Sequence, residues 1–405
     1  MRQDRLGLLG AIVVFFMNST FAQSGDQSDV GKRASDAMKL EGLRRSEHIL
    51  DLHVHQHKFD DAARLQLGLT QFLVAVENLG RGLYRYGLIS GGSEGMFLRL
   101  PIPKNENPSE IDCAEFLLLI DRFQSDLMKA EGTLAMVQTD DVKVPLKLAD
   151  VVFRLGPSHV AGTSLVSVIE SLRQGGLNIT KDNPEYLMKF DRGDVAWLRS
   201  YCHLLSGMVD VYHAYDVTMW FNDLGDRVFP RIKKLDEQNK RRDIMEITLA
   251  DPTRLHGFRK HLLAVCDLNA ETWRHIRAER DDDFEWLPHA KQTDQLGIPL
   301  SDAQIDSWLE MIVHLKEILT GDRLIPSAML KYVVPGSEEG MGLSIAKLLD
   351  DPPVNFNWDR ISNDGINEKY LEPEEGRELL DLMVLFRVGS LFNGPLGIPS
   401  AIRMN

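Results

Sequence analysis

The sequence predicts a mainly α protein, an irregular array of many helices with one short β element near residues 142–155. Apolar residues recur at intervals of three and four over most of the chain, the spacing of one helix face. A single segment alternates apolar and polar residues instead, and glycine and proline clusters separate the periodic stretches. With 43% hydrophobic and 26% charged residues, the composition is that of a globular chain with a sizeable core.

The first 22 residues read as a secretory signal peptide. Arg2 and Arg5 precede a short apolar run over residues 6–17. Residues 19–22 then resemble the A-x-A-like cleavage site of a signal peptide. The run is too short for a convincing membrane span, so an uncleaved anchor is the weaker alternative. We expect an exported protein, periplasmic or extracellular, with no membrane span after signal cleavage.

Helices dominate the predicted first half. One helix is expected over residues 34–57, a second from residues 59–62 onward, and a third from Ser109 onward, where Asp112 strengthens the start signal. The turn at residues 58–62 resembles that of a tetratricopeptide-like hairpin. No second copy follows at a spacing near 34 residues, so a repeat array is not expected.

The predicted β element covers two alternating runs. Residues 142–148 and 151–155 have the pattern of a short strand or an extended pair, and Pro145 confines any such ladder to a sheet edge. A short helix over residues 163–174 is expected next.

The second half should contain a central helix over residues 191–215, because apolar residues cover most of the circumference of that helix and such a helix is buried. Asp194 lies at the start of this helix, where a negative charge offsets the helix dipole. Further helices are expected over residues 252–280 and 302–319, the latter capped by Ser301 and ended by Gly321. A final helix is expected over residues 372–387.

These elements suggest five regions: a signal peptide (1–22), an N-terminal helical region (23–140), the extended element (141–160), a central helical region (161–330) and a loop-rich C-terminal region with a final helix (331–405). The mature chain would then form one large helical domain, or two lobes that meet near the extended element.

The net charge limits the kinds of partner that we expect, and the number of cysteines limits the disulfides that can form. A net charge of −14 argues against nucleic acid or an anionic membrane surface as the main partner, so we expect an unidentified extracytoplasmic partner or ligand. The three cysteines, Cys113, Cys202 and Cys266, cannot all pair within the chain. Buried reduced thiols fit their apolar helical surroundings better than one disulfide with a free thiol.

Two clusters could carry chemistry. His53 and His57 share a helix face and could bind a metal with Asp60 or Asp61 as a third ligand, although solvated histidines at a helix end are the simpler interpretation. Asp281, Asp282, Asp283 and Glu285 form the second cluster, followed by Trp286.

The acidic cluster has three interpretations. Its carboxylates could bind Ca²⁺, although the central glycine of a calcium loop is absent. They could supply an acid and a base beside Trp286, as in a sugar-processing site. The interpretation we favour is a solvated acidic end of the helix over residues 252–280, balanced by cations such as Arg277 and Arg280.

Several stretches resemble a family of uncharacterised exported bacterial proteins of about this length. They are residues 67–77, 82–88, 98–103, 190–203 and 281–288. The resemblance spans most of the mature chain and implies export and a mainly helical fold. It implies no activity and no site residues.

The expected function is that of a soluble exported binding or structural scaffold, and the alternative is a metal-dependent or carboxylate-based hydrolase acting on an extracellular substrate. Cofactors are unknown. The arrangement of the acidic side chains in the fold distinguishes the scaffold from the hydrolase. An enzyme should gather acidic residues from distant segments, with His203 or His213, around one pocket, whereas a scaffold should have a broad groove without converging titratable groups.

Overall fold

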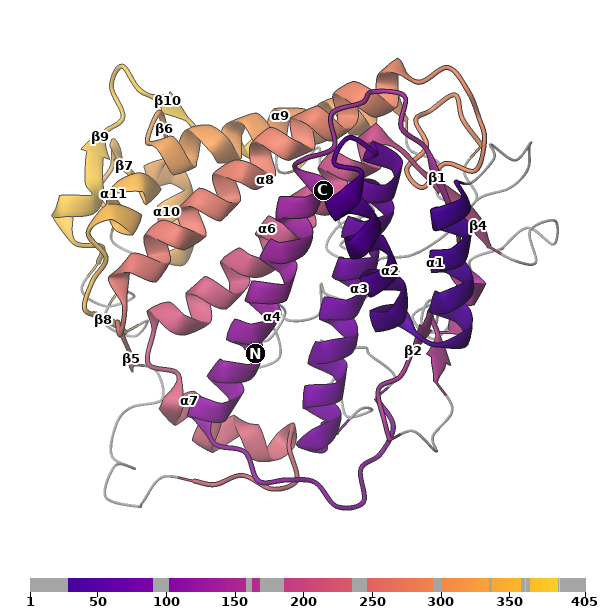
Figure 1. The fold of residues 1–405 in the computed structure, drawn as a ribbon. Coiled ribbons are helices and arrows are strands. Elements are labelled where there is room, and N and C mark those ends of the chain that lie inside the picture. Colours follow the sequence, from indigo (N-terminus) through magenta and orange to yellow (C-terminus); the bar gives the residue numbers. More distant parts are fainter. Residues whose placement is uncertain are drawn as a thin grey trace.

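The computed structural model describes residues 28–89, 102–157, 162–167, 186–234, 246–293, 301–334, 337–357, 361, 365–384 and 386. The predicted signal peptide lies outside these residues. The described chain is mainly α with small two-stranded sheets, which confirms the predicted fold class (Figure 1). Among the helices of the described ranges, no helix combines the length and apolar character that crossing a bilayer requires.

The N-terminal helices are α1 (Asp29–Leu40), α2 (Leu43–Gln56) and α3 (Asp61–Arg85). The single helix expected over residues 34–57 is therefore wrong. The chain breaks at Gly42, whose φ of 110° is a conformation that side-chain-bearing residues rarely adopt. Helices α2 and α3 pack against each other as a hairpin, and its likeness to a tetratricopeptide unit remains a prediction.

Helix α4 (Cys113–Leu134) begins four residues later than expected. Its start is a capping box in which the Asp112 side chain accepts the Glu115 backbone N–H and the Glu115 side chain accepts the Asp112 N–H. Asp112 is thus the N-cap, not the third residue of a box that begins at Ser109. Helix α4 packs against α3 on one side and α6 on the other.

Helices α6 (Arg192–Ala214), α8 (Pro252–Ala278) and α9 (Asp302–Thr320) follow in order, with α6 packed between α4 and α8 and α9 on the outer side of α8 (Figure 1). The most extensive helix packing is between α6 and α8. Trp197 and Leu205 on α6 are 1% and 2% exposed, which confirms the central position expected for this helix. Ser301 caps α9 and Gly321 ends it in the left-handed conformation, as the sequence predicts.

The predicted β element contains two separate strands. Strand β1 (Val144–Lys147) pairs antiparallel with β4 (Leu187–Phe190), and β2 (Val152–Phe153) pairs antiparallel with β3 (Thr163–Ser164). The 3₁₀ turn η3 (Leu148–Asp150) separates β1 from β2. The two runs therefore do not pair with each other. In the range expected to form a helix, residues 163–164 form β3 and residues 165–167 are helical. Residues 168–174 lie outside the described part of the chain.

The remaining elements are short and lie toward the C-terminus or at the ends of the long helices. They are α7 (Thr218–Leu224), η4 (Gly225–Arg227), β5 (Glu246–Thr248), β6 (Arg323–Leu324), α10 (Ser327–Val333), β7 (Met341–Leu343), α11 (Ile345–Asp350), β8 (Asn355–Asn357), η6 (Glu368–Tyr370), β9 (Leu371–Pro373) and β10 (Glu378–Leu379). Strand β5 pairs with β8, β7 with β9, and β6 with β10.

The final helix expected over residues 372–387 is wrong in its first half. Strands β9 and β10 occupy that part of the range, and the helical residues of the described part are 382–384 and 386. The backbone at residues 371–373 instead makes its hydrogen bonds to strand β7. All three cysteines are buried free thiols, as expected.

Candidate functional site

Three segments that are far apart in the sequence meet at the N-terminus of α6. Strand β4 leads into α6, β1 runs beside β4, and the chain that leaves α8 returns along β4 at residues 284–287. The Lys189 N–H donates to the Phe284 carbonyl at 3.1 Å. The Trp286 ring stacks on Phe190 at 5.7 Å between ring centroids, which fixes the returning chain against the core.

Two lysines, one in β4 and one in the loop before β1, form ion pairs with the acidic residues 281–285. Lys143 Nζ donates to Asp281 and, at 2.7 Å, to Asp283, and it lies 3.6 Å from Glu285. Lys189 Nζ also donates to Asp283. Burial lowers the pKa of Lys143, but hydrogen bonds to the carboxylates outweigh it and raise that pKa above its usual value. Lys143 is therefore charged at neutral pH.

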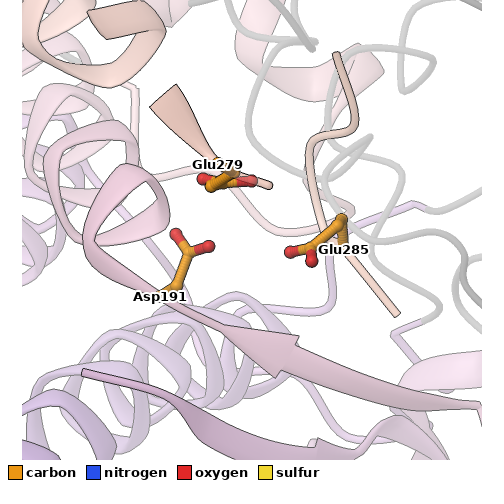
Figure 2. Close-up of side chains that lie close together, drawn as sticks. All are labelled: Asp191, Glu279 and Glu285. Carbon is orange, nitrogen blue, oxygen red and sulfur yellow. The ribbon is translucent and has the colours of Figure 1, made fainter. Parts of the chain in front are cut away.

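Behind this ion-pair network, Asp191, Glu279 and Glu285 converge. Each offers a carboxyl oxygen, and these oxygens all lie within 4.8 Å of one another. Figure 2 shows the three side chains pointing toward a common space, from the start of α6, the end of α8 and the returning chain. Glu285 is 2% exposed and Asp191 is 6% exposed, so this space is largely removed from bulk water.

Asp191 is the N-cap of α6. Its Oδ1 accepts the backbone N–H groups of Gly193 at 2.8 Å and Asp194 at 3.3 Å, and Asp194 accepts the Asp191 N–H in return. These bonds and the positive end of the helix dipole favour the ionised form of Asp191. Burial nevertheless raises the pKa of Asp191 above its usual value.

Glu279 shares a hydrogen bond with Asp191, and two ionised carboxylates cannot make one because neither carries a proton. Burial, and next the charge of Asp191, raise the pKa of Glu279 to about 10. Gln292 Nε2 donates to Glu279 Oε2 at 3.0 Å. Among the described residues, backbone N–H groups donate to Asp191 and none donates to Glu279, so Glu279 is the member that holds the proton at neutral pH and donates it to Asp191.

Glu285 and Asp194 complete the buried acidic group. Burial and the charge of Asp191 raise the pKa of Glu285 to about 8, although Lys143 opposes the shift. Burial and Asp191 also raise the pKa of Asp194 well above its usual value. Near neutral pH some of these buried carboxyl groups are therefore protonated. The bound protons reduce the negative charge that additional cations would otherwise have to balance.

A cleft of about 610 Å³ opens beside the Asp191–Glu279 pair. Its lining residues are Asp140, Asp141, Val142, Lys143, Asp191, Arg192, Arg274, His275, Ala278, Glu279 and Asp281. Burial and the charges of Arg274 and Arg192 lower the pKa of His275, whose Nε2 lies 3.0 Å from Arg274 and accepts its N–H. His275 is thus neutral in a cleft that contains both signs of charge.

Gly193 allows α6 and α8 to approach at this point. A Cβ on Gly193 would lie 2.8 Å from Ile276 Cγ1 and 3.5 Å from Glu279 Oε1. Any side chain there would push the end of α8 away from Asp191. The sequence 191–194 therefore supplies both the acid that caps α6 and the space for its partner acid.

The acidic cluster predicted from the sequence is brought together in part. Asp281, Asp283 and Glu285 surround Lys143, whereas Asp282 accepts the Thr293 backbone N–H at 2.8 Å and its hydroxyl at 2.5 Å. The solvated helix end that we expected is wrong for Asp283 and Glu285, which are largely buried.

The cations expected to balance these acids are also different. Lys143 and Lys189 take the place proposed for Arg277 and Arg280, and Arg277 pairs with Asp306 at 2.7 Å. Trp286 is 4% exposed and contacts Trp197 in the core. Its ring therefore cannot stack on a sugar in the cleft.

His53 and His57 lie at the turn between α2 and α3, and neither belongs to the acidic groups around Lys143 and Asp191. His53 Nε2 is 2.8 Å from Asp60 Oδ2, and the rings of His53 and His57 are 4.3 Å apart. Asp61 instead accepts N–H groups from Gln138 and Thr139. Within the described ranges, two groups of three acidic side chains lie close enough to hold an ion, Asp191–Glu279–Glu285 and Asp281–Asp283–Glu285, and neither contains a histidine.

Sequence reasoning missed Lys143, Lys189, Asp191 and Glu279. The pattern Asp191-x-x-Asp194 before the most apolar helix is a signal for a capping box, but nothing local indicates that Glu279 reaches it. Comparisons with protein-family models, with curated proteins and with solved structures found no match to this chain.

Proposed function

We propose that this protein is a carboxylate-based hydrolase that acts on an extracellular substrate. The observation that carries the proposal is the convergence of the Asp191, Glu279 and Glu285 carboxyl oxygens within 4.8 Å of one another, with Asp191 and Glu279 lining the cleft. Acids from distant segments converge on one pocket, as an enzyme requires and as a scaffold with a plain groove does not. The expected histidines, His203 and His213, do not line this cleft, and His275 does.

The pair suits water activation because its two members hold different protonation states. Ionised Asp191 accepts a proton from a water molecule while the water oxygen bonds to the electrophilic carbon of the substrate. Glu279 gives its proton to the leaving oxygen or nitrogen as the scissile bond breaks. Transfer of the proton from Asp191 to Glu279 across their hydrogen bond restores the starting state.

The lysine network positions this pair. Lys143 holds Asp283 and approaches Glu285, so the returning chain stays close to the end of α8. Its charge also limits the rise of the Glu285 pKa. Glu285 is then the third acid, which sets how strongly Glu279 keeps its proton.

The test is hydrolysis of chromogenic p-nitrophenyl esters, p-nitrophenyl glycosides and peptide p-nitroanilides. We expect turnover of one class, with kcat lowered about 100-fold or more in Glu279→Gln and in Asp191→Asn, the size typical of a lost general acid or base. Glu338→Gln, on an exposed glutamate of the C-terminal region, is the matched control and should keep full activity.

The pH profile provides a second readout. Activity should fall in acid as Asp191 becomes protonated and in alkali as Glu279 loses its proton near pH 10. Turnover that survives Glu279→Gln unchanged would overturn the proposal, as would the absence of turnover in all three substrate classes.

We propose that the enzyme acts after export, because of the signal-peptide pattern at residues 1–22. Intact-mass measurement of the protein from the extracytoplasmic fraction should show a chain that begins near residue 23. A full-length chain confined to the cytoplasm would contradict export without bearing on the carboxyl pair.

A further inference from the structure

Helices α8 and α9 run side by side (Figure 1). Residues of both helices line a second hollow, in the groove between them, which shares Arg274 with the cleft. Its volume is about 460 Å³, within the range of small-molecule sites. The apolar lining residues come from both helices: Cys266, Ala270, Trp273, Leu309, Ile312 and Val313. Trp273 and Ile312 are buried beneath it, whereas Val313 is 53% exposed at its open side.

The rim of the groove is positively charged, although the whole chain carries a net charge of −14. Arg274, Arg277 and Lys316 line it, together with one acid, Asp267. Lys316 pairs with Asp267 at 2.5 Å and Arg277 pairs with Asp306 at 2.7 Å. Two rim cations are therefore neutralised by acids, which leaves Arg274 as the position to consider for an anionic ligand.

Arg274 joins the groove to the cleft, because it lines both. Within the described part of the chain, its guanidinium contacts the neutral ring of His275 and makes no ion pair with a carboxylate. An anion bound at Arg274 would lie between the apolar groove and the Asp191–Glu279 pair. A guanidinium at the end of an apolar groove is the arrangement that complements an amphipathic anion.

We infer that the α8/α9 groove binds the apolar part of a small amphipathic anion whose negative group contacts Arg274. This inference rests on the proposed hydrolase function, because the groove is a substrate subsite only if the Asp191–Glu279 pair beside it cleaves the substrate. The substrate class is then a small molecule with an apolar group next to an acidic group. Binding itself requires no turnover and can be measured separately.

The binding probe is 8-anilinonaphthalene-1-sulfonate, an apolar ring system with one sulfonate. The folded full chain should enhance its fluorescence, with energy transfer from Trp273 beneath the groove. Val313→Glu should weaken binding about tenfold or more, because the new carboxylate would lose hydration and repel the sulfonate. Leu118→Glu is the matched control, since Leu118 on α4 is 49% exposed and lies outside the groove.

The neutral analogue N-phenyl-1-naphthylamine tests the role of Arg274. Arg274→Gln should weaken sulfonate binding and leave binding of the neutral analogue unchanged. Equal weakening of both probes by Arg274→Gln would overturn the inference, as would equal effects of Val313→Glu and Leu118→Glu. Circular dichroism of each variant establishes that the helices are intact.

Failure of this inference is distinguishable from failure of the hydrolase proposal. Glu279→Gln should abolish turnover and leave probe binding unchanged, because Glu279 lines the cleft and not the groove. Suppose that the groove variants affect probe binding no more than the control does, while turnover is intact. The groove is then not a substrate subsite, and the carboxyl pair remains the proposed active site. Specific probe binding without any turnover would leave an anion-binding groove and overturn the hydrolase.

Discussion

Glu279 is the side chain whose ionisation state most depends on the fold. Its raised pKa means that the folded chain binds a proton which the unfolded chain releases between about pH 4.5 and pH 10. Stability contributed by this proton is present below the unfolded pKa and is lost as the pH rises toward the folded pKa. Alkaline pH therefore forces a second charge into a site that already holds Asp191.

Glu279→Gln should remove this pH dependence, because the amide donates to Asp191 without a titratable proton. At pH 9 we expect the variant to be about 1–2 kcal/mol more stable than the natural chain, a modest figure because solvent reaches the half-buried Glu279. At pH 4.5 the two should be equal. Urea unfolding at both pH values measures the difference, and Glu338→Gln should change neither value. A variant less stable than the natural chain at pH 9 would contradict the shared proton.

Helices α6 and α8 are joined by a second polar chain, away from the carboxyl pair. His203 Nδ1 lies 2.8 Å from His261 Nδ1, and the outer ring nitrogens lie 3.6 Å from Glu131 on α4 and from Asp210 on α6. One histidine donates and the other accepts, so at least one ring is neutral. Burial and the proximity of His203 lower the pKa of His261 below its usual value.

Acid should therefore weaken the packing of α6 on α8. A lowered histidine pKa gives stability that is present above about pH 6.5 and is lost as the pH falls through that value. His261→Gln should lose less stability between pH 7 and pH 5 than the natural chain does. Thermal unfolding across this range provides the comparison, with His55→Gln, 74% exposed in its side chain, as control. Parallel pH curves for His261→Gln and the natural chain would exclude this role.

At the scale of the whole molecule, one hydrophobic cluster extends from Met38 on α1 to Leu349 on α11. Trp197 is 1% exposed in this cluster and contacts Tyr201 and Trp286. Trp197→Ala should lower the free energy of unfolding by about 3–5 kcal/mol. Because the cluster is continuous, fluorescence and far-ultraviolet circular dichroism should report the same shifted transition. A shift seen by one probe and not the other would indicate a core that unfolds in parts.

The sequence predicts the long helices well because each carries its own periodicity and cap. Residues 191–215, 252–280 and 302–319 are each helical within two residues of the expected ends. It fails where partners come from elsewhere in the chain. Strand β9 forms because β7 pairs with it, and Glu285 is buried because Lys143 reaches it from a loop some 140 residues earlier. No local pattern encodes such contacts.

The long sequence separations at the carboxyl pair also set the order in which the site can be completed. A chain that emerges from its N-terminus exposes Lys143 and the cap of α6 long before Glu279 and Glu285 are available. Until α8 has been made and packed on α6, Asp191 has its backbone donors but no second acid. The site can therefore be completed only after the chain has been made through Glu285 and α8 has packed on α6.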